Sequence, residues 1–212
     1  ALIGLAIGDA LGTTFEFSSR QRAQAAEIEM IGGGPFGLPP GYWTDDTSMA
    51  LCLADSLIEK GFDTNDQMNR YVQWYESGYR SSTAKCFDIG RTTLRSLALY
   101  KKTTNPECGV AGESDAGNGS IMRLAPIALW AFKYGLKQTI RYGVASSKTT
   151  HGSKECLDAC AYLSEILYLA LGSETKETIL APKSDPAQSI ATKISDFYNL
   201  TPDNAPNTGY VV

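Results

Sequence analysis

The sequence predicts an all-α fold: one compact domain of about seven or eight helices. Apolar residues recur at three- and four-residue spacing in successive segments, and strand-like alternation is sustained nowhere. Polar stretches or stretches rich in glycine and proline separate these segments, as expected of loops between helices. The 212 residues are enough for a single domain with a sizeable core, and we expect one over residues 1–212.

The first predicted helix covers residues 1–11, which are apolar almost all the way round. Gly4, Gly8 and Gly12 recur every fourth residue and predict a close approach to a neighbouring helix. The segment is too short to span a membrane, contains Asp9 and lacks a basic leader. Asp9 and the nearby Glu16 are carboxylates in apolar surroundings. Each is therefore either a structural hydrogen-bonding residue or part of a charged site.

The second helix opens with Thr44-Asp45-Asp46, after a loop over residues 31–41 that is either a plain connector or a flap. In one interpretation Thr44 is the N-cap, and the two aspartates favour the positive end of the helix dipole. In the other, the three side chains supply hard oxygen ligands to Mg²⁺ or Mn²⁺. A cap needs only one side chain, and adjacent carboxylates repel each other unless a cation is present. The motif alone leaves both interpretations open.

Two further helices follow. A capping box, Thr64 with Gln67, begins the first, and Asp88 is expected to cap the second, which runs to about Lys101. Residues 103–119 are polar and contain glycine, so they are expected to form a loop.

The glycine-rich run 115–120 leads into a buried helix over residues 121–130. Exposed backbone N–H groups at such a helix start suit a phosphate or a ribose hydroxyl. The alternative is an Asn-Gly turn followed by a Ser120 cap.

The last part of the chain is also expected to be helical. A short helix covers about Thr139 to Ser147, and a long one begins at the N-cap Ser153 and ends at Gly172. His151, the only histidine, precedes that cap and is either a hydrogen-bonding surface residue or a ligand contact. Another helix starts at Asp185-Pro186, with a stripe formed by Ile190, Ile194 and Phe197.

Charge and cysteine content exclude several classes of protein. The net charge is −4 and no run of basic residues exceeds two, which argues against a nucleic-acid partner. Five cysteines without CxxC spacing, together with one histidine, build no zinc site. We expect a cytoplasmic protein in a reducing compartment, with no membrane partner. The sequence leaves the oligomeric state open.

Four separated motifs follow one another along the chain: Gly8-Asp9-Ala10-Leu11-Gly12 with Glu16, Trp43-Thr44-Asp45-Asp46-Thr47-Ser48-Met49, Gly117-Asn118-Gly119-Ser120-Ile121-Met122-Arg123-Leu124-Ala125-Pro126, and Thr150-His151. Taken together and in this order, they resemble the motifs of the ADP-ribosylglycohydrolase family. They cover nearly the whole chain, which makes the resemblance more specific than any one motif.

The resemblance implies an all-α hydrolase with two divalent ions, Mg²⁺ or Mn²⁺, in a cleft between helices. It implies metal ligation by Thr44, Asp45 and Asp46, and a catalytic role for Asp45, Asp46 and Glu16. The implied reaction is hydrolysis of the glycosidic bond between ADP-ribose and a protein side chain, most often arginine. The partner would be an ADP-ribosylated protein or a small molecule that contains ADP-ribose. The implied substrate-binding residues are Asp115, Gly117, Asn118, Gly119, Ser120, Met122 and His151.

One departure from the family pattern bears on activity. The family completes its metal site with a second acidic run on a late helix, and this sequence has none. The sequence stops at the apolar residues Tyr210-Val211-Val212, so we expect the domain to be incomplete at its C-terminus. The alternative function is a non-catalytic binder of ADP-ribose or a nucleotide, or a structural member of the family. The acceptor, arginine or serine, and the choice between Mg²⁺ and Mn²⁺ stay open.

Overall fold

A computed structural model describes residues 1–19, 29–112, 115–181, 183–186, 188 and 190. Over these ranges the chain forms α-helices and two short 3₁₀-helices, with isolated β-bridges and no strand, which confirms the predicted all-α class. In the same ranges, no helix is both long enough and apolar enough to cross a membrane. The helices are α1 (Leu2–Gly12), η1 (Thr13–Phe15), α3 (Asp45–Lys60), α4 (Thr64–Ser77), α5 (Arg91–Thr103), α6 (Ala125–Ala131), η3 (Phe132–Tyr134), α7 (Leu136–Ser147), α8 (Lys154–Leu171) and α9 (Lys176–Ile179).

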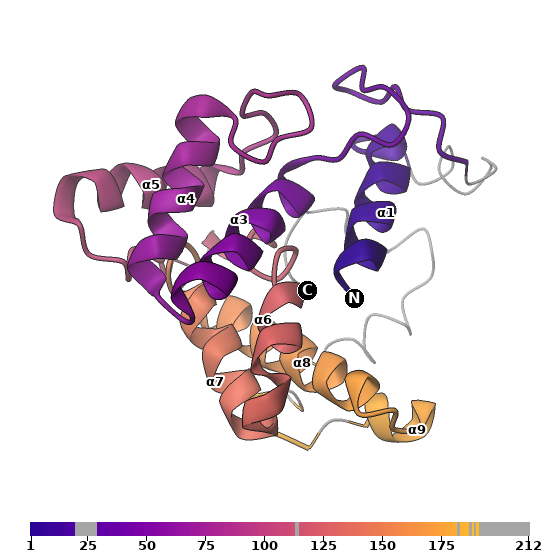
Figure 1. Ribbon diagram of the computed structural model, residues 1–212, viewed down its shortest axis with the longest axis vertical. Helices are drawn as coiled ribbons and strands as arrows, with labels where there is room; N and C mark the ends of the chain where they lie inside the picture. The colour runs from indigo at the N-terminus through magenta and orange to yellow at the C-terminus, as the bar shows by residue number, and fades with distance from the viewer. Residues whose placement is uncertain (20–28, 113–114, 182, 187, 189, 191–212) are drawn as a thin grey trace.

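Helix α3 is the centre of the fold. Figure 1 shows α4 and α5 on one side of it and α6, α7 and α8 on the other, while α1 packs beside it. Its apolar residues serve two cores: Met49 and Cys52 join residues of α4 and α5, and Leu53 and Leu57 join residues of α6 and α8. This double burial holds α3 rigidly, and with it the two aspartates of its first turn.

A carboxylate from α1 caps α3. Asp9 accepts hydrogen bonds from the backbone N–H groups of Thr44 and Thr47, each at 3.1 Å. It also accepts from the hydroxyls of Thr44, at 2.8 Å, and Thr47, at 2.6 Å. Asp9 is therefore a structural hydrogen-bonding residue. The interpretation of Thr44 as the capping side chain is wrong, because a more distant and charged acceptor satisfies the first turn.

The glycine face of α1 is not packed. A Cβ atom at Gly4, Gly8 or Gly12 would meet no described atom within 4 Å, so the predicted close approach of another helix is not found there. The side chains of Ile3 and Ile7 are also exposed, at 77% and 48%. Helix α1 contacts α3 and α6.

The starts of α4, α5 and α6 differ from the sequence prediction in how they are capped or where they lie. Helix α4 is capped by Asp63, whose side chain accepts from two backbone N–H groups at 2.9 and 3.1 Å, and not by the Thr64 capping box. Helix α5 begins at Arg91, because Asp88 adopts a left-handed conformation with φ of 59°. Helix α6 begins at Ala125 and not at residue 121, because the backbone N–H groups of residues 121 and 122 turn back to the carbonyl of residue 118.

The bounds of the last helices agree better with those predicted from the sequence. Ser153 caps α8, with its side chain accepting from the N–H of Cys156, and Gly172 ends the helix. Helix α7 ends at residue 147 as predicted but begins earlier, at Leu136. Residues 185 and 186 are helical as expected, whereas Ile194 and Phe197 lie outside the described residues.

Candidate active site

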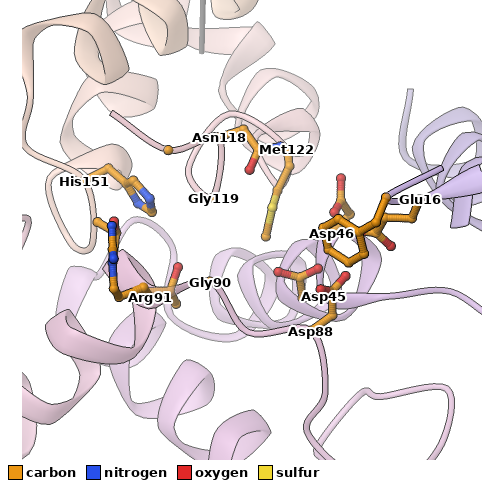
Figure 2. Close-up of a pocket in the computed structure, with 14 residues that line it drawn as sticks. Glu16, Asp45, Asp46, Asp88, Gly90, Arg91, Asn118, Gly119, Met122 and His151 are labelled. Carbon is orange, nitrogen blue, oxygen red and sulfur yellow. The ribbon is translucent and has the colours of Figure 1, made fainter. Parts of the chain in front are cut away.

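A cavity of about 280 Å³ lies where four segments of the chain meet. The segment after η1, the first turn of α3, the start of α5 and the glycine loop that precedes α6 surround it, together with His151 (Figure 2). These segments are far apart in the sequence, so the cavity exists only in the folded chain. Its lining is formed by Glu16, Phe17, Asp45, Asp46, Asp88, Gly90, Arg91, Thr92, Thr93, Gly117, Asn118, Gly119, Met122 and His151.

Carboxylates gather at one end of this cavity. Figure 2 shows Glu16, Asp45, Asp46 and Asp88 close together there, each contributed by a separate turn except for the adjacent aspartates. Burial raises the pKa of Asp45 well above its usual range, and the negative charges of Asp46 and Asp88 raise it further. Burial, with the charges of Asp9 and Glu16, raises the pKa of Asp46 to about 6. This end of the cavity therefore resists carrying its full negative charge.

Glu16 and Asp88 form a coupled pair within this cluster. Burial, together with the charge of Asp88 and a hydrogen bond to it, raises the pKa of Glu16 to about 7. Burial also raises the pKa of Asp88 to about 6. A carboxyl group that titrates near neutral pH is suited to giving or taking a proton.

The chemistry of this end fits a hard divalent cation. Such ions prefer carboxylate and hydroxyl oxygens, and a cation would relieve the repulsion that the raised pKa values express. The Thr44 hydroxyl donates its proton to Asp9, so its oxygen lone pairs remain available to a cation. Thr44 also lines an adjoining hollow of about 390 Å³, together with Asp46 and Glu16. However, no group of three or more His, Cys, Asp or Glu side chains in the described part of the chain is arranged to hold a metal ion. The described residues therefore offer suitable donors but no complete ligand set.

The opposite end of the cavity carries hydrogen-bond donors. Figure 2 places His151 and Arg91 there, with Asn118 and Gly119 between them and the carboxylates. A Cβ atom at residue 119 would lie 2.7 Å from the imidazole Cε1 of His151 and 2.9 Å from the hydroxyl of Thr93. Only glycine lets the loop approach the ring so closely. Burial, with the charge of Arg123, lowers the pKa of His151 to about 3, so the imidazole is neutral near pH 7.

The cavity brings together most of the residues singled out from the sequence. Glu16, Asp45, Asp46, Gly117, Asn118, Gly119, Met122 and His151 all line it. Asp115 and Ser120 are buried beside the loop and are not part of the lining. The Asp115 carboxylate forms an ion pair with Arg95 at 2.9 Å, and the Ser120 hydroxyl accepts from that of Ser147 at 2.9 Å.

Several lining residues were missed from the sequence. The sequence predicts Asp88 only as a helix cap and Thr93 only as a residue of the helix that follows it, and it does not single out Phe17, Gly90, Arg91 or Thr92. The two residues between Asp88 and the start of α5, the second of them glycine, were the one available signal that Asp88 belongs to a turn.

The all-α fold and the acidic cavity faced by a glycine loop fit the family that the four sequence motifs resemble. The model of that family, described as ADP-ribosylglycohydrolase, matches residues 1–208, and the chain belongs to the family.

Particular relatives are similar over the whole chain. An ADP-ribosylarginine hydrolase Tri1 from Pseudomonas putida is 41% identical over 100% of this chain and 57% of its own length. The Tri1 hydrolase of Serratia proteamaculans is 38% identical over 100% of this chain and 58% of its own length. The ADP-ribosyl-[dinitrogen reductase] glycohydrolase of Rhodospirillum rubrum is 32% identical, over 100% of this chain and 69% of its own.

A solved structure described as an ADP-ribosylglycohydrolase-related protein complex superimposes with a TM-score of 0.81 at 38% identity. The match covers 99% of this chain and 69% of that one. This chain thus spans 57–69% of the length of these four proteins.

Proposed function

We propose that this chain contributes to a metal-dependent hydrolase that cleaves the glycosidic bond between ADP-ribose and an arginine side chain of a protein. The observation that carries the proposal is the polarity of the cavity, with carboxylates at one end and neutral or cationic donors at the other. ADP-ribose has the matching asymmetry, because its diphosphate is anionic and its reactive ribose carries hydroxyl groups. The names of the two Tri1 relatives favour arginine as the acceptor.

The separation of donors and carboxylates in the cavity favours one orientation of bound ADP-ribose. The diphosphate would lie near Arg91, His151 and the backbone of the glycine loop, where donors rather than carboxylates face it. The ribose and its bond to the acceptor would then lie near Glu16 and Asp45. The reverse orientation would place phosphate charges against four carboxylates, which their mutual repulsion disfavours.

Thr44, Asp45 and Asp46 would hold Mg²⁺ or Mn²⁺ in this scheme. When bound, such ions would supply Lewis acidity and would neutralise the carboxylates. Glu16 lies across the cavity from the donors, and in this scheme it would accept a proton from the attacking water.

The test is release of ADP-ribose from a peptide ADP-ribosylated on arginine, in the presence of Mg²⁺ or Mn²⁺. The double substitution Asp45→Asn and Asp46→Asn is expected to abolish release. Glu76→Gln is the matched control, because Glu76 is an exposed carboxylate that pairs with Lys101 on α5 and lies outside the cavity. Full activity of the double variant would reject the assignment.

A second candidate function is binding of ADP-ribose without turnover. The absence of a complete set of metal ligands among the described residues favours it. This function predicts calorimetric binding of ADP-ribose by the wild-type chain, together with no release of ADP-ribose at any concentration of Mg²⁺ or Mn²⁺.

A further inference from the structure

A buried arginine connects the glycine loop to His151. The Arg123 side chain is fully buried, and its guanidinium lies 4.5 Å from the centre of the Tyr71 ring. One nitrogen, Nη1, donates to the carbonyl of Gly119 at 2.8 Å. Within the described ranges no carboxylate pairs with this charge, so hydrogen bonds to neutral groups must compensate its burial.

The other terminal nitrogen fixes two threonine hydroxyls. Nη2 of Arg123 donates to Thr150 Oγ1 at 2.7 Å and to Thr149 Oγ1 at 3.1 Å. A guanidinium has donors only, so both oxygens must accept these bonds. Each hydroxyl therefore has its own proton left to donate. Thr149 donates its proton to the carbonyl of Ser146 at 2.7 Å.

The remaining neighbour of the Thr150 hydroxyl is the imidazole of the next residue. Thr150 Oγ1 lies 2.8 Å from His151 Nδ1, and no other acceptor for this hydroxyl proton occurs in the part of the chain that the structure describes. If Nδ1 carried the proton instead, the hydroxyl would accept two bonds and its own proton would be buried without an acceptor. The hydroxyl therefore donates to Nδ1.

A neutral imidazole carries one proton, so an accepting Nδ1 leaves the proton on Nε2. Nε2 is on the side of the ring that lies against Gly117 and Gly119, where it faces the cavity. Among the described residues it has no hydrogen-bond partner, although His151 is only 2% exposed. An N–H that faces a cavity without a protein partner is available to donate to an acceptor on a ligand.

We propose that Arg123 and Thr150 are positioning residues that fix His151 in the Nε2–H tautomer, so that the ring donates a hydrogen bond to a diphosphate oxygen of the bound ligand. The identity of the ligand rests on the proposed function, whereas the tautomer follows from the protein alone. Arg123 also holds the Gly119 carbonyl, so the same residue sets the loop against the ring.

Nitrogen-15 NMR of protein labelled at histidine tests the tautomer without any ligand. Because His151 is the only histidine of the chain, the spectrum contains one pair of ring nitrogens, and protonated and unprotonated nitrogens resonate far apart. At pH 7 the wild-type protein is expected to carry its proton on Nε2. A proton on Nδ1 would overturn the proposal, and this measurement requires no variant to fold.

Substitutions at the two threonines separate positioning from packing. Thr150→Val keeps the shape of the side chain but removes the hydroxyl, and is expected to shift the proton toward Nδ1. Thr150→Ser is expected to restore the wild-type spectrum. Thr149→Val is the matched control, because it removes a neighbouring contact of Arg123 and leaves the bond between Thr150 and His151 in place. A wild-type spectrum for Thr150→Val would contradict the role of the hydroxyl.

Calorimetric titration with ADP-ribose tests the ligand. Thr150→Val is expected to weaken binding about tenfold, as loss of one hydrogen bond to a charged group would. Thr150→Ser and Thr149→Val are expected to stay within about threefold of the wild type, which corresponds to less than half of that free-energy change. Equal affinity of Thr150→Val and the wild type would overturn the role of His151 as a donor. If the wild type itself does not bind ADP-ribose, the proposed function fails, while the NMR result still decides the tautomer.

Discussion

Replacing His151 by glutamine should remove part of the acid sensitivity of the fold. Burial, with the positive charge of Arg123, lowers the pKa of this imidazole from 6.5 to about 3 in the folded protein. Between these two pH values the unfolded chain binds a proton at this site and the folded chain does not. Acidification therefore favours unfolding, and the loss of stability begins as the pH falls below 6.5.

The size of the effect follows from the shift. A pKa difference of one corresponds to about 1.4 kcal/mol, so the full effect amounts to roughly 5 kcal/mol and is reached only below pH 3. At pH 5, which lies 1.5 below the pKa of the unfolded chain, the loss of stability is about 2 kcal/mol. The glutamine variant has no titrating group at this position and should lack this component.

Urea unfolding followed by circular dichroism at pH 7.5 and pH 5.0 measures the effect. Between these pH values, the free energy of unfolding of the wild type should change by about 2 kcal/mol more in the destabilising direction than that of His151→Gln. The cavity carboxylates titrate in both proteins, so their contribution cancels in the difference. Equal pH dependence of the two proteins would refute the claim that the folded protein keeps this imidazole neutral.

Three further substitutions and one addition test other parts of the site. Asp9→Ala should lower the free energy of unfolding by about 2 kcal/mol in urea titrations, because the first turn of α3 loses its cap. Gly119→Ala should weaken ADP-ribose binding at least about tenfold in calorimetry, because its Cβ would collide with the His151 ring. Arg91→Gln should weaken the same binding about fivefold, and less at high salt, because Arg91 is exposed to solvent. Mn²⁺ at 100 times its Kd should stabilise the fold by about 2.7 kcal/mol, and Asp45→Asn should abolish this gain.

A control or a contradicting result is defined for each of these four predictions. Gly90→Ala is the control for Gly119→Ala, since its Cβ would meet no described atom within 4 Å although Gly90 also lines the cavity. Equal effects of the two substitutions would argue against a specific collision at residue 119. A salt-independent loss in Arg91→Gln would rule out an electrostatic role. Stabilisation by Mn²⁺ that survives in Asp45→Asn would place the ion elsewhere, and an unchanged stability of Asp9→Ala would show that water replaces the cap.

The helices were predictable from the sequence because their apolar spacing reflects burial. The cap at Ser153 and the end of α8 at Gly172 are local features, and the structure reproduces them. Helix starts were harder to predict where the capping side chain belongs to a distant part of the sequence. Thr44 has the right chemistry for a cap, but Asp9 fulfils that role from 35 residues away, which no local pattern shows.

The same distinction separates the site residues that were found from those that were missed. Asp45, Asp46 and the glycine loop belong to contiguous motifs, whereas Asp88 stands alone and reaches the cavity through a left-handed turn. The glycine loop lines the cavity, but not as the start of a helix. Helix α6 begins five residues after the loop, which borders the cavity through its contact with His151.

The cap from Asp9 makes the stability of one helix turn depend on another helix. The amide hydrogens of Thr44 and Thr47 are held by a side chain of α1, and α1 leaves Ile3 77% exposed and so has little buried surface to retain it. Whenever α1 detaches, these amides should exchange with solvent while the rest of α3 stays protected. Glu16 follows α1 closely in the chain, so the same opening would withdraw it from Asp45. Hydrogen exchange at two threonines would thus report how often the acidic end of the cavity is assembled.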